Sequence, residues 1–358
     1  MAATVSATDV ELLKPVNVIM QNTLLRNAKA LAPYFAGTSA AEIAEHGGTF
    51  TAKWRRIENL TPTTTALTEL TGNASAYPRD SVAASVTDVT ATVAKFGQYI
   101  ILSEEADLAN FSSQMNKLIE ILGISAGRSL NMVQRNEMED NATIVYGTAA
   151  AASDGAVVTA ATKDNFKGVI NTLLRNDAMP FSASTVGSQN IGTSPILAAF
   201  WAINHPDVSV DVEGFAGFKS VETYAGQVEV MPGEYGLIQS GGHAVRFIQT
   251  SDASIDANSG GATGSTGLRG ATNIDLYSVP VYGKDAVGSL GLGTKHVKEV
   301  YRAGDNLPAV QLINKGFGSA GAADPFNELS TLAWKAWSAA KVLNSTWIRT
   351  VRVGATDI

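Results

Sequence analysis

The segment WAINHPDVSVDV (201–212) holds a histidine and an aspartate two residues apart, His205 and Asp207. An imidazole oriented by a carboxylate is the general base of hydrolase triads, so this pair could serve catalysis. In an extended segment, however, residues i and i+2 point to opposite faces, and Pro206 favours an extended His205. No G-x-S-x-G segment supplies a serine nucleophile. We therefore predict that His205, Pro206 and Asp207 form a structural corner at the end of a helix.

Other motifs that could bind metals or phosphate are incomplete. The remaining histidines have no metal-ligand spacing: His46, His243 and His296. The EMED segment (137–140) lacks a calcium-loop pattern and is typical of a solvated helix end. GSLGLGTK (288–295) has threonine before lysine, the reverse of the Walker order, and GATGSTG (261–267) has no lysine, so both predict turns. The sequence thus predicts no catalytic residue, no cofactor and no metal, and the protein is not expected to be an enzyme.

The composition favours a chain that is covered by partners. Of the 358 residues, 45% are apolar and 16% are charged, against about 25% charged in a typical protein. The net charge is −7 and the sequence has no basic run, so the composition does not indicate a basic surface that would bind nucleic acid. The absence of cysteine excludes disulfides and thiolate chemistry. The N-terminal segment has no basic start, and no apolar run reaches 18 residues, so we expect a cytoplasmic product without a membrane span.

Two strand-like segments predict a long β-arm. Residues 47–60 carry basic side chains around Trp54, and residues 85–103 alternate apolar and polar side chains. At ~3.3 Å per residue each limb would reach roughly 40 Å, and an isolated two-stranded ribbon is marginal in water. The rest of the chain offers no obvious cover, so we expect a neighbouring copy to lie against the arm. The basic cluster would then face acids of that copy and not nucleic acid.

The remaining elements predict a mixed α+β chain. A helix of about 104–140 starts at the N-cap Ser103 and carries one apolar stripe, and its length would be roughly 50 Å. Further helices are expected at 163–177, at 195–206 and after Asp324 over 326–343. Strands are expected around 220–231, 243–250, 276–283 and 345–354, with a flexible surface loop at 258–273.

This order of segments resembles the HK97-like fold of tailed-bacteriophage major capsid proteins, and more narrowly the coliphage N4-type major capsid family. The segments that carry the resemblance occur in order along nearly the whole chain: GGTFTAKWRRIENLTPTTTALTEL, AKFGQYIILSEEAD, AAFWAINHPDV, PGEYGLIQSGGHAVRFIQT, VYGKDAVG, DPFNELSTLAWKAW and VLNSTWIR. The resemblance implies four parts: an N-terminal arm (1–46), an extended β-loop (47–102), a peripheral domain with a spine helix (103–190 and 301–358) and an axial domain (191–300). The corner at His205 would lie in the axial domain.

The resemblance also implies a function. The chain would assemble through pentamers and hexamers into an icosahedral head that encloses double-stranded DNA without sequence-specific binding, with a portal and possible scaffold and decoration proteins as further partners. It would be assembled in the host cytoplasm and reside in the virion. The expected inter-subunit contacts are seven residues of the β-loop: Lys53, Trp54, Arg55, Arg56, Glu69, Tyr77 and Arg79. The alternative is an encapsulin-type nanocompartment shell that encloses cargo proteins.

Overall fold

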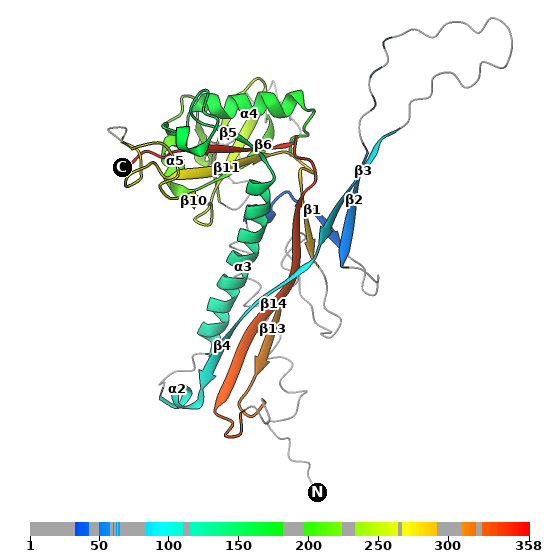
Figure 1. Ribbon diagram of the computed structural model, residues 1–358, viewed down its shortest axis with the longest axis vertical. Helices are drawn as coiled ribbons and strands as arrows, with labels where there is room; N and C mark the ends of the chain where they lie inside the picture. Colours follow the sequence, from blue (N-terminus) through cyan, green and yellow to red (C-terminus); the bar gives the residue numbers. More distant parts are fainter. Residues whose placement is uncertain are drawn as a thin grey trace, which may run out of the picture.

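The computed structural model describes residues 33–42, 50–57, 60, 62, 64, 84–109, 115–181, 197–223, 233–263, 267–291, 310–319 and 324–358. These residues form two lobes and a projecting ribbon (Figure 1). The upper lobe is built on an eight-stranded sheet, the spine lobe on a five-stranded sheet with a long helix beside it, and the ribbon on two strands.

The sheet of the upper lobe is mixed, with the strand order β5-β15-β11-β6-β9-β8-β7 and β10 beside β11. Its strands are β5 (Thr143–Tyr146), β6 (Ala198–Asn204), β7 (Lys219–Ser220), β8 (Glu234–Ser240), β9 (His243–Gln249), β10 (Ile255–Asp256), β11 (Leu276–Tyr282) and β15 (Ile348–Val353). Helices α4 (Lys163–Arg175) and α5 (Pro206–Glu213) and the 3-10 turns η3 (Asp154–Ala156) and η4 (Val221–Thr223) complete the lobe.

Both faces of this sheet are covered, which explains why its central strands β6, β9 and β11 are almost entirely buried. On one face Phe166 and Ile170 of α4 pack with Val279 of β11 in the main core. On the other face Tyr282 of β11 packs with Met138 from the long helix. All seven residues of β11 are buried, as expected for a strand between two apolar layers.

The spine lobe has the strand order β1-β12-β14-β13, with β4 also paired to β14. Its elements are η1 (Pro33–Phe35), β1 (Ser39–Glu42), β4 (Ala94–Ser103), α2 (Glu104–Ala109), α3 (Met115–Asp140), β12 (Val287–Gly291), β13 (Val310–Lys315) and β14 (Leu329–Val342). The apolar stripe of α3 packs on this sheet: Leu122, Ala126 and Leu130 contact the cluster that contains Trp334. The predicted spine helix is therefore present from Met115, while Glu104–Ala109 form a separate short helix that points in another direction (Figure 1).

The ribbon consists of β2 (Thr51–Ile57) and β3 (Val86–Thr92), which pair antiparallel over their whole length and project away from both lobes (Figure 1). The predicted strand at 85–103 is thus divided. Its first half belongs to the ribbon, and its second half, β4, pairs with ten residues of β14. A two-stranded arm is therefore confirmed, but its described strands pair over seven residues each and not over the roughly 40 Å expected for each limb.

Two predicted helices are wrong, because both segments are strands. Residues 198–204 form β6, in which a continuous apolar run lies between two covered faces, and such a run cannot be distinguished from a buried helix by its periodicity. Residues 329–342 form β14, in which Leu332, Trp334 and Ala336 alternate with less buried neighbours. Cross-strand packing outweighs the helix propensity of the alanines there. Asp324 accepts the backbone N–H of Leu329 at 2.8 Å and so supports the turn before β14.

The strand predicted at 220–231 is wrong over Val221–Thr223, which form η4, and residues 224–231 lie outside the described part. Helix α4 and the strands β9, β11 and β15 occupy their expected positions. The described part of the 258–273 loop is more ordered than expected, because Asn258 Oδ1 accepts backbone N–H groups of Ala271, Thr272 and Asn273 at 3.1–3.3 Å. No helix among the described residues is both long and apolar enough to cross a membrane.

Sheet pairing joins segments that the expected domain boundaries separate. Strands β5 and β15, expected in the peripheral part, pair in the same sheet as β11. Strand β12, expected in the axial part, pairs with β14. Within the described residues the backbone crosses between the lobes three times, from α3 to β5, from β11 to β12 and from β14 to β15, and each connection is two to five residues long.

Candidate functional sites

His205 is the N-cap of α5. Its backbone is extended (φ −74°, ψ 150°), as expected before a proline, and Pro206 occupies the first helical position. The Nδ1 atom accepts the backbone N–H of Asp207 at 3.2 Å and so satisfies one of the free N–H groups of the helix start. The predicted corner therefore exists, but it starts a helix and does not end one.

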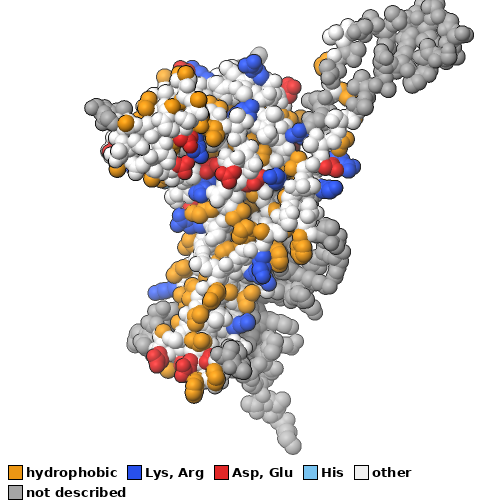
Figure 2. All heavy atoms as spheres, viewed as in Figure 1, with side chains coloured by type: hydrophobic (Ala, Val, Ile, Leu, Met, Phe, Trp, Pro, Cys, Tyr) orange, Lys and Arg blue, Asp and Glu red, His pale blue; other side chains and the backbone are white. Residues whose placement is uncertain are grey.

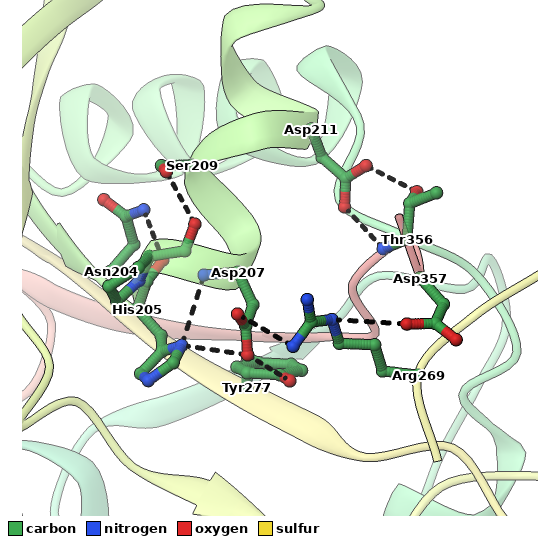
Figure 3. A network of polar contacts seen from close by, with 10 residues as sticks. Asn204, His205, Asp207, Ser209, Asp211, Arg269, Tyr277, Thr356 and Asp357 are labelled. Carbon is green, nitrogen blue, oxygen red and sulfur yellow. Dashed lines mark hydrogen bonds and ion pairs between the residues drawn. The ribbon is translucent and has the colours of Figure 1, made fainter.

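Asp207 faces a buried tyrosine and an arginine. The hydroxyl of Tyr277 donates to Oδ2 at 2.8 Å, and the Arg269 guanidinium lies 3.0 Å from Oδ1 (Figure 3). The expectation that His205 and Asp207 point apart is wrong: Nδ1 lies 3.2 Å from Oδ2. The reason is that the helix begins between them, so the period-two geometry of a strand does not apply.

The protonation of His205 argues against a catalytic dyad. Because Nδ1 accepts the Asp207 N–H, it has no proton to donate to the carboxylate, which is the bond that orients the base of a triad. Burial lowers the pKa of His205, and the Asp207 charge opposes this shift only in part. No hydroxyl group of the described residues hydrogen-bonds to the imidazole. The neutral ring is therefore a helix cap.

The second half of α5 holds the C-terminal end of the described residues. Asp211 Oδ2 accepts the backbone N–H of Thr356 at 3.0 Å, and its Oδ1 accepts the Thr356 hydroxyl at 2.5 Å. Arg269 also lies 3.7 Å from Asp357 (Figure 3). This network joins α5, β11, the 267–270 loop and the C-terminal segment, so it stabilises the upper lobe.

The base of the ribbon is the second candidate site. Trp54 of β2 is half-buried and packs with Ala91, Leu290, Trp337 and Ala339 of its own chain. Phe50 stacks on Trp337 with ring centroids 5.7 Å apart. The expectation that the chain itself offers no cover is therefore wrong for the base of the arm, which rests on the spine lobe.

The predicted contact residues divide into two kinds. Arg56 donates from Nη1 to the carbonyl of Leu343 at 3.0 Å, so it holds the ribbon to its own chain, as Trp54 does. Lys53 and Arg55 are exposed. Arg55 lies 3.2 Å from Asp88, its partner directly opposite on β3. Three further predicted contacts lie outside the described residues: Glu69, Tyr77 and Arg79.

The described parts of the remaining motifs form no group of metal-ligating side chains. Residues 288–291 of the Walker-like segment lie in β12, so the turn expected there is a strand, and residues 292–295 lie outside the described part. His46 and His296 also lie outside it. No group of three metal-ligating side chains occurs among the described residues.

The EMED segment is not the solvated helix end that we predicted. Met138 is fully buried. Glu137 Oε1 accepts the backbone N–H of Val342 at 3.2 Å and pairs with Lys341 at 3.1 Å. Glu139 Oε2 accepts the hydroxyl of Ser254 at 2.7 Å. The end of α3 is enclosed because it meets the upper lobe (Figure 1).

The sequence reasoning missed an exposed apolar surface on the spine lobe. The side chains of β4 alternate, and Phe96 and Ile100 pack toward α3. Tyr99 and Ile101 therefore face the opposite side of the sheet, where they are 65% and 51% exposed. Apolar side chains also gather on the lower part of the molecule in the face that Figure 2 shows.

Comparison with known proteins relates the chain to capsids by structure alone. No family profile and no curated protein sequence matches the chain. The capsid of Ralstonia phage GP4 matches with a TM-score of 0.58 and 10% identity, over 90% of this chain and 88% of that chain. The Cyanophage Pam1 capsid matches with a TM-score of 0.51 and 13% identity, over 91% of this chain and 93% of that chain. The structure of Microbacterium phage Oxtober96 matches with a TM-score of 0.51 and 9% identity, over 89% of this chain and 90% of that chain. The chain therefore has the α+β, HK97-like capsid fold.

Proposed function

We propose that the protein is the major capsid protein of a tailed bacteriophage, of the coliphage N4 type, and that it self-assembles into an icosahedral shell. The observation that carries this proposal is the ribbon of β2 and β3, which projects from a two-lobed body with the capsid fold (Figure 1). Among the described residues of the ribbon region, Phe50, Trp54 and Arg56 contact the spine side of their own chain. We further propose that the axial domain (191–300) supplies strands β6–β11 of the upper lobe and that the peripheral domain (103–190 and 301–358) supplies α3, β13 and β14 of the spine lobe.

The exposed apolar face of the spine lobe supplies a surface that a neighbouring copy can cover. Tyr99 and Ile101 lie on this face, and Phe50 and Val86 of the ribbon region are 57% and 49% exposed. A ribbon that lies on the next subunit makes a head-to-tail contact, which closes into rings of five and six. Weak contacts of this kind add up in a closed lattice.

The charge of the chain is consistent with a container for DNA. A duplex carries one negative charge per ~1.7 Å of its axis, so a subunit with a net charge of −7 repels it overall. We propose that the shell encloses double-stranded DNA without binding its sequence. Portal, scaffold and decoration proteins are the further partners proposed, with assembly in the host cytoplasm and residence in the virion.

Negative-stain electron microscopy with light scattering on the purified chain tests this proposal. Closed shells, or rings of five and six, are the expected result. Deletion of residues 62–80 should leave a folded subunit that forms no stable shells. A stable monomer from the intact chain, even with its co-expressed phage proteins, would contradict the proposal. Co-purified cargo enzymes in place of DNA would identify the encapsulin alternative.

A further inference from the structure

One face of the spine sheet points away from α3 and carries lysines. Residues directly opposite on paired strands share a face, and Ala333 of β14 lies opposite Tyr99 of β4 and Ile313 of β13. At every second position from these residues, the same face continues along the three strands. We call it the lysine face, and its lysines and large apolar side chains are Lys95, Lys315, Lys335, Tyr99, Ile101 and Ile313. Among its described residues it has no carboxylate.

The chain's own ribbon covers the upper end of the lysine face. Trp337 lies on this face at that end, where Lys95 Nζ is 5.9 Å from its ring centroid. Phe50 stacks on Trp337, and Trp54 packs in the same cluster. Further down the face, Tyr99 is 65% exposed and no described segment covers it. The lower half of the face is therefore open and offers both apolar surface and positive charge.

The lower end of the spine lobe carries the opposite charge. Helix α2 exposes Glu104, Glu105 and Leu108, of which Leu108 is 78% exposed. The backbone N–H of Glu104 donates to the carbonyl of Glu328 at 2.8 Å, so α2 adjoins the turn before β14, where Phe326 is 81% exposed. We call these five residues the acidic tip. Figure 2 shows acidic and apolar side chains together at this end of the molecule.

The acidic tip lies beyond the end of its own lysine face. Ser103 and Leu329 form the last pair of β4 and β14, and α2 begins at the next residue, Glu104. The tip therefore prolongs the sheet and does not fold back over it (Figure 1). The tip of a second copy has no such constraint, and it matches the face in both charge and apolar character.

Two other occupants match the lysine face less well. The described ribbon exposes Lys53 and Arg55, so a neighbouring ribbon would bring positive charge to the lysines and be repelled. The phosphates of a DNA duplex would pair with the lysines. They would, however, offer nothing apolar to Tyr99 and Ile101, which are more than half exposed.

We propose that the acidic tip of one copy docks on the lysine face of a neighbouring copy. This contact rests on the proposed self-assembly and adds to it an interface that does not use the ribbon. Leu108 and Phe326 cover the apolar part of the face, and the glutamates pair with its lysines. Pairs of opposite charge at such a contact fix the register of the two copies and speed their encounter.

An exchange of charges tests the contact. Lys315→Glu with Lys335→Glu makes the face acidic, and Glu104→Lys with Glu105→Lys makes the tip basic. In light scattering, the protein concentration at which half of the chains assemble should rise on the order of tenfold to hundredfold for each double variant. A mixture of the two double variants restores opposite charges at every contact between unlike copies, so assembly should recover. Failure of the mixture to recover would overturn the proposal.

The matched control changes two exposed lysines of the upper lobe. Lys219→Glu with Lys284→Glu alters the net charge as much as the face variant does, but lies away from both the face and the tip. It should assemble as the unchanged chain does. If the face and tip variants assemble like this control, the contact is wrong while the proposed capsid function stands. A stable monomer of the unchanged chain, even with its co-expressed phage proteins, contradicts the capsid function and the contact together.

Cross-linking identifies the occupant of the face without altering any charge of the contact. Because the chain has no cysteine, Tyr99→Cys and Leu108→Cys introduce its only thiols. In particles assembled from a mixture of these two variants, a short thiol-reactive cross-linker should join unlike copies, which mass spectrometry distinguishes. A Tyr99→Cys chain that joins Arg55→Cys and not Leu108→Cys would place the neighbour's ribbon on the face and overturn the proposal.

Discussion

The hydrogen bond between Tyr277 and Asp207 should contribute measurably to the stability of the upper lobe. Tyr277 is 2% exposed, and its hydroxyl donates to the carboxylate at 2.8 Å. A hydrogen bond to a charged group contributes about 1.5–3 kcal/mol. The neighbouring pair with Arg269 is partly exposed and adds less than about 1 kcal/mol. We therefore expect Tyr277→Phe to lower the free energy of unfolding by about 2 kcal/mol.

A double-mutant cycle measured by denaturant unfolding separates this bond from its surroundings. Asp207→Asn keeps the shape of the side chain but removes its charge, so its cost should overlap with that of Tyr277→Phe. The expected coupling is about 1–2 kcal/mol, within the range for residues that share a bond. The reasoning is refuted if Tyr277→Phe unfolds within about 0.5 kcal/mol of the unchanged chain. It is also refuted if the free-energy changes of the two single variants add up to that of the double variant.

Four further outcomes are expected. Leu130→Ala leaves a cavity at a fully buried position between α3 and β14, so it should lower the free energy of unfolding by about 2–5 kcal/mol in denaturant titrations. The control Ile121→Ala, at a position that is 56% exposed, should change it by less than about 0.5 kcal/mol. Gly37→Ala should reduce the melting temperature, because φ is +66° and the added Cβ would lie 2.5 Å from the Trp201 ring. Trp54→Ala should lower the free energy of unfolding by about 2 kcal/mol and reduce the yield of the proposed shells in electron microscopy, because it removes the anchor of the ribbon base. Burial raises the pKa of Glu139 from 4.5 to about 7, so its contribution to stability is fully present below pH 4.5 and is lost as the pH rises through about 7. Unfolding titrations should therefore show a decline of about 3 kcal/mol that Glu139→Gln abolishes.

The sequence predicts the elements whose pattern is set by one exposed and one buried face. The ribbon strands alternate, and α3 carries an apolar stripe at helical spacing, so both were identified. The strands β6 and β14 were not identified from the sequence. In β6 both faces are buried and the alternation disappears. In β14 alanines and tryptophans suggested a helix, and only its pairing with β13 and with the distant strand β4 makes the segment a strand.

The candidate sites, too, could be predicted from the sequence only in part. The structural role of His205 could be predicted from the missing nucleophile, but its contact with Asp207 depends on a helix that the sequence reasoning placed on the wrong side. A polar stripe on α3 had a signal in the sequence, since Arg128, Asn131 and Arg135 recur at helical spacing. Their partners, however, come from a turn more than a hundred residues away, which no local pattern indicates.

The three short crossings between the lobes restrict how the subunit can deform. Two bodies joined by one linker can swing, whereas two bodies joined by three connections of two to five residues must bend all of them together. Torque applied to the upper lobe is then transmitted to the spine lobe with little loss. Any change in the curvature of an assembled wall would be absorbed where a single pair of strands meets the body, at the base of the ribbon.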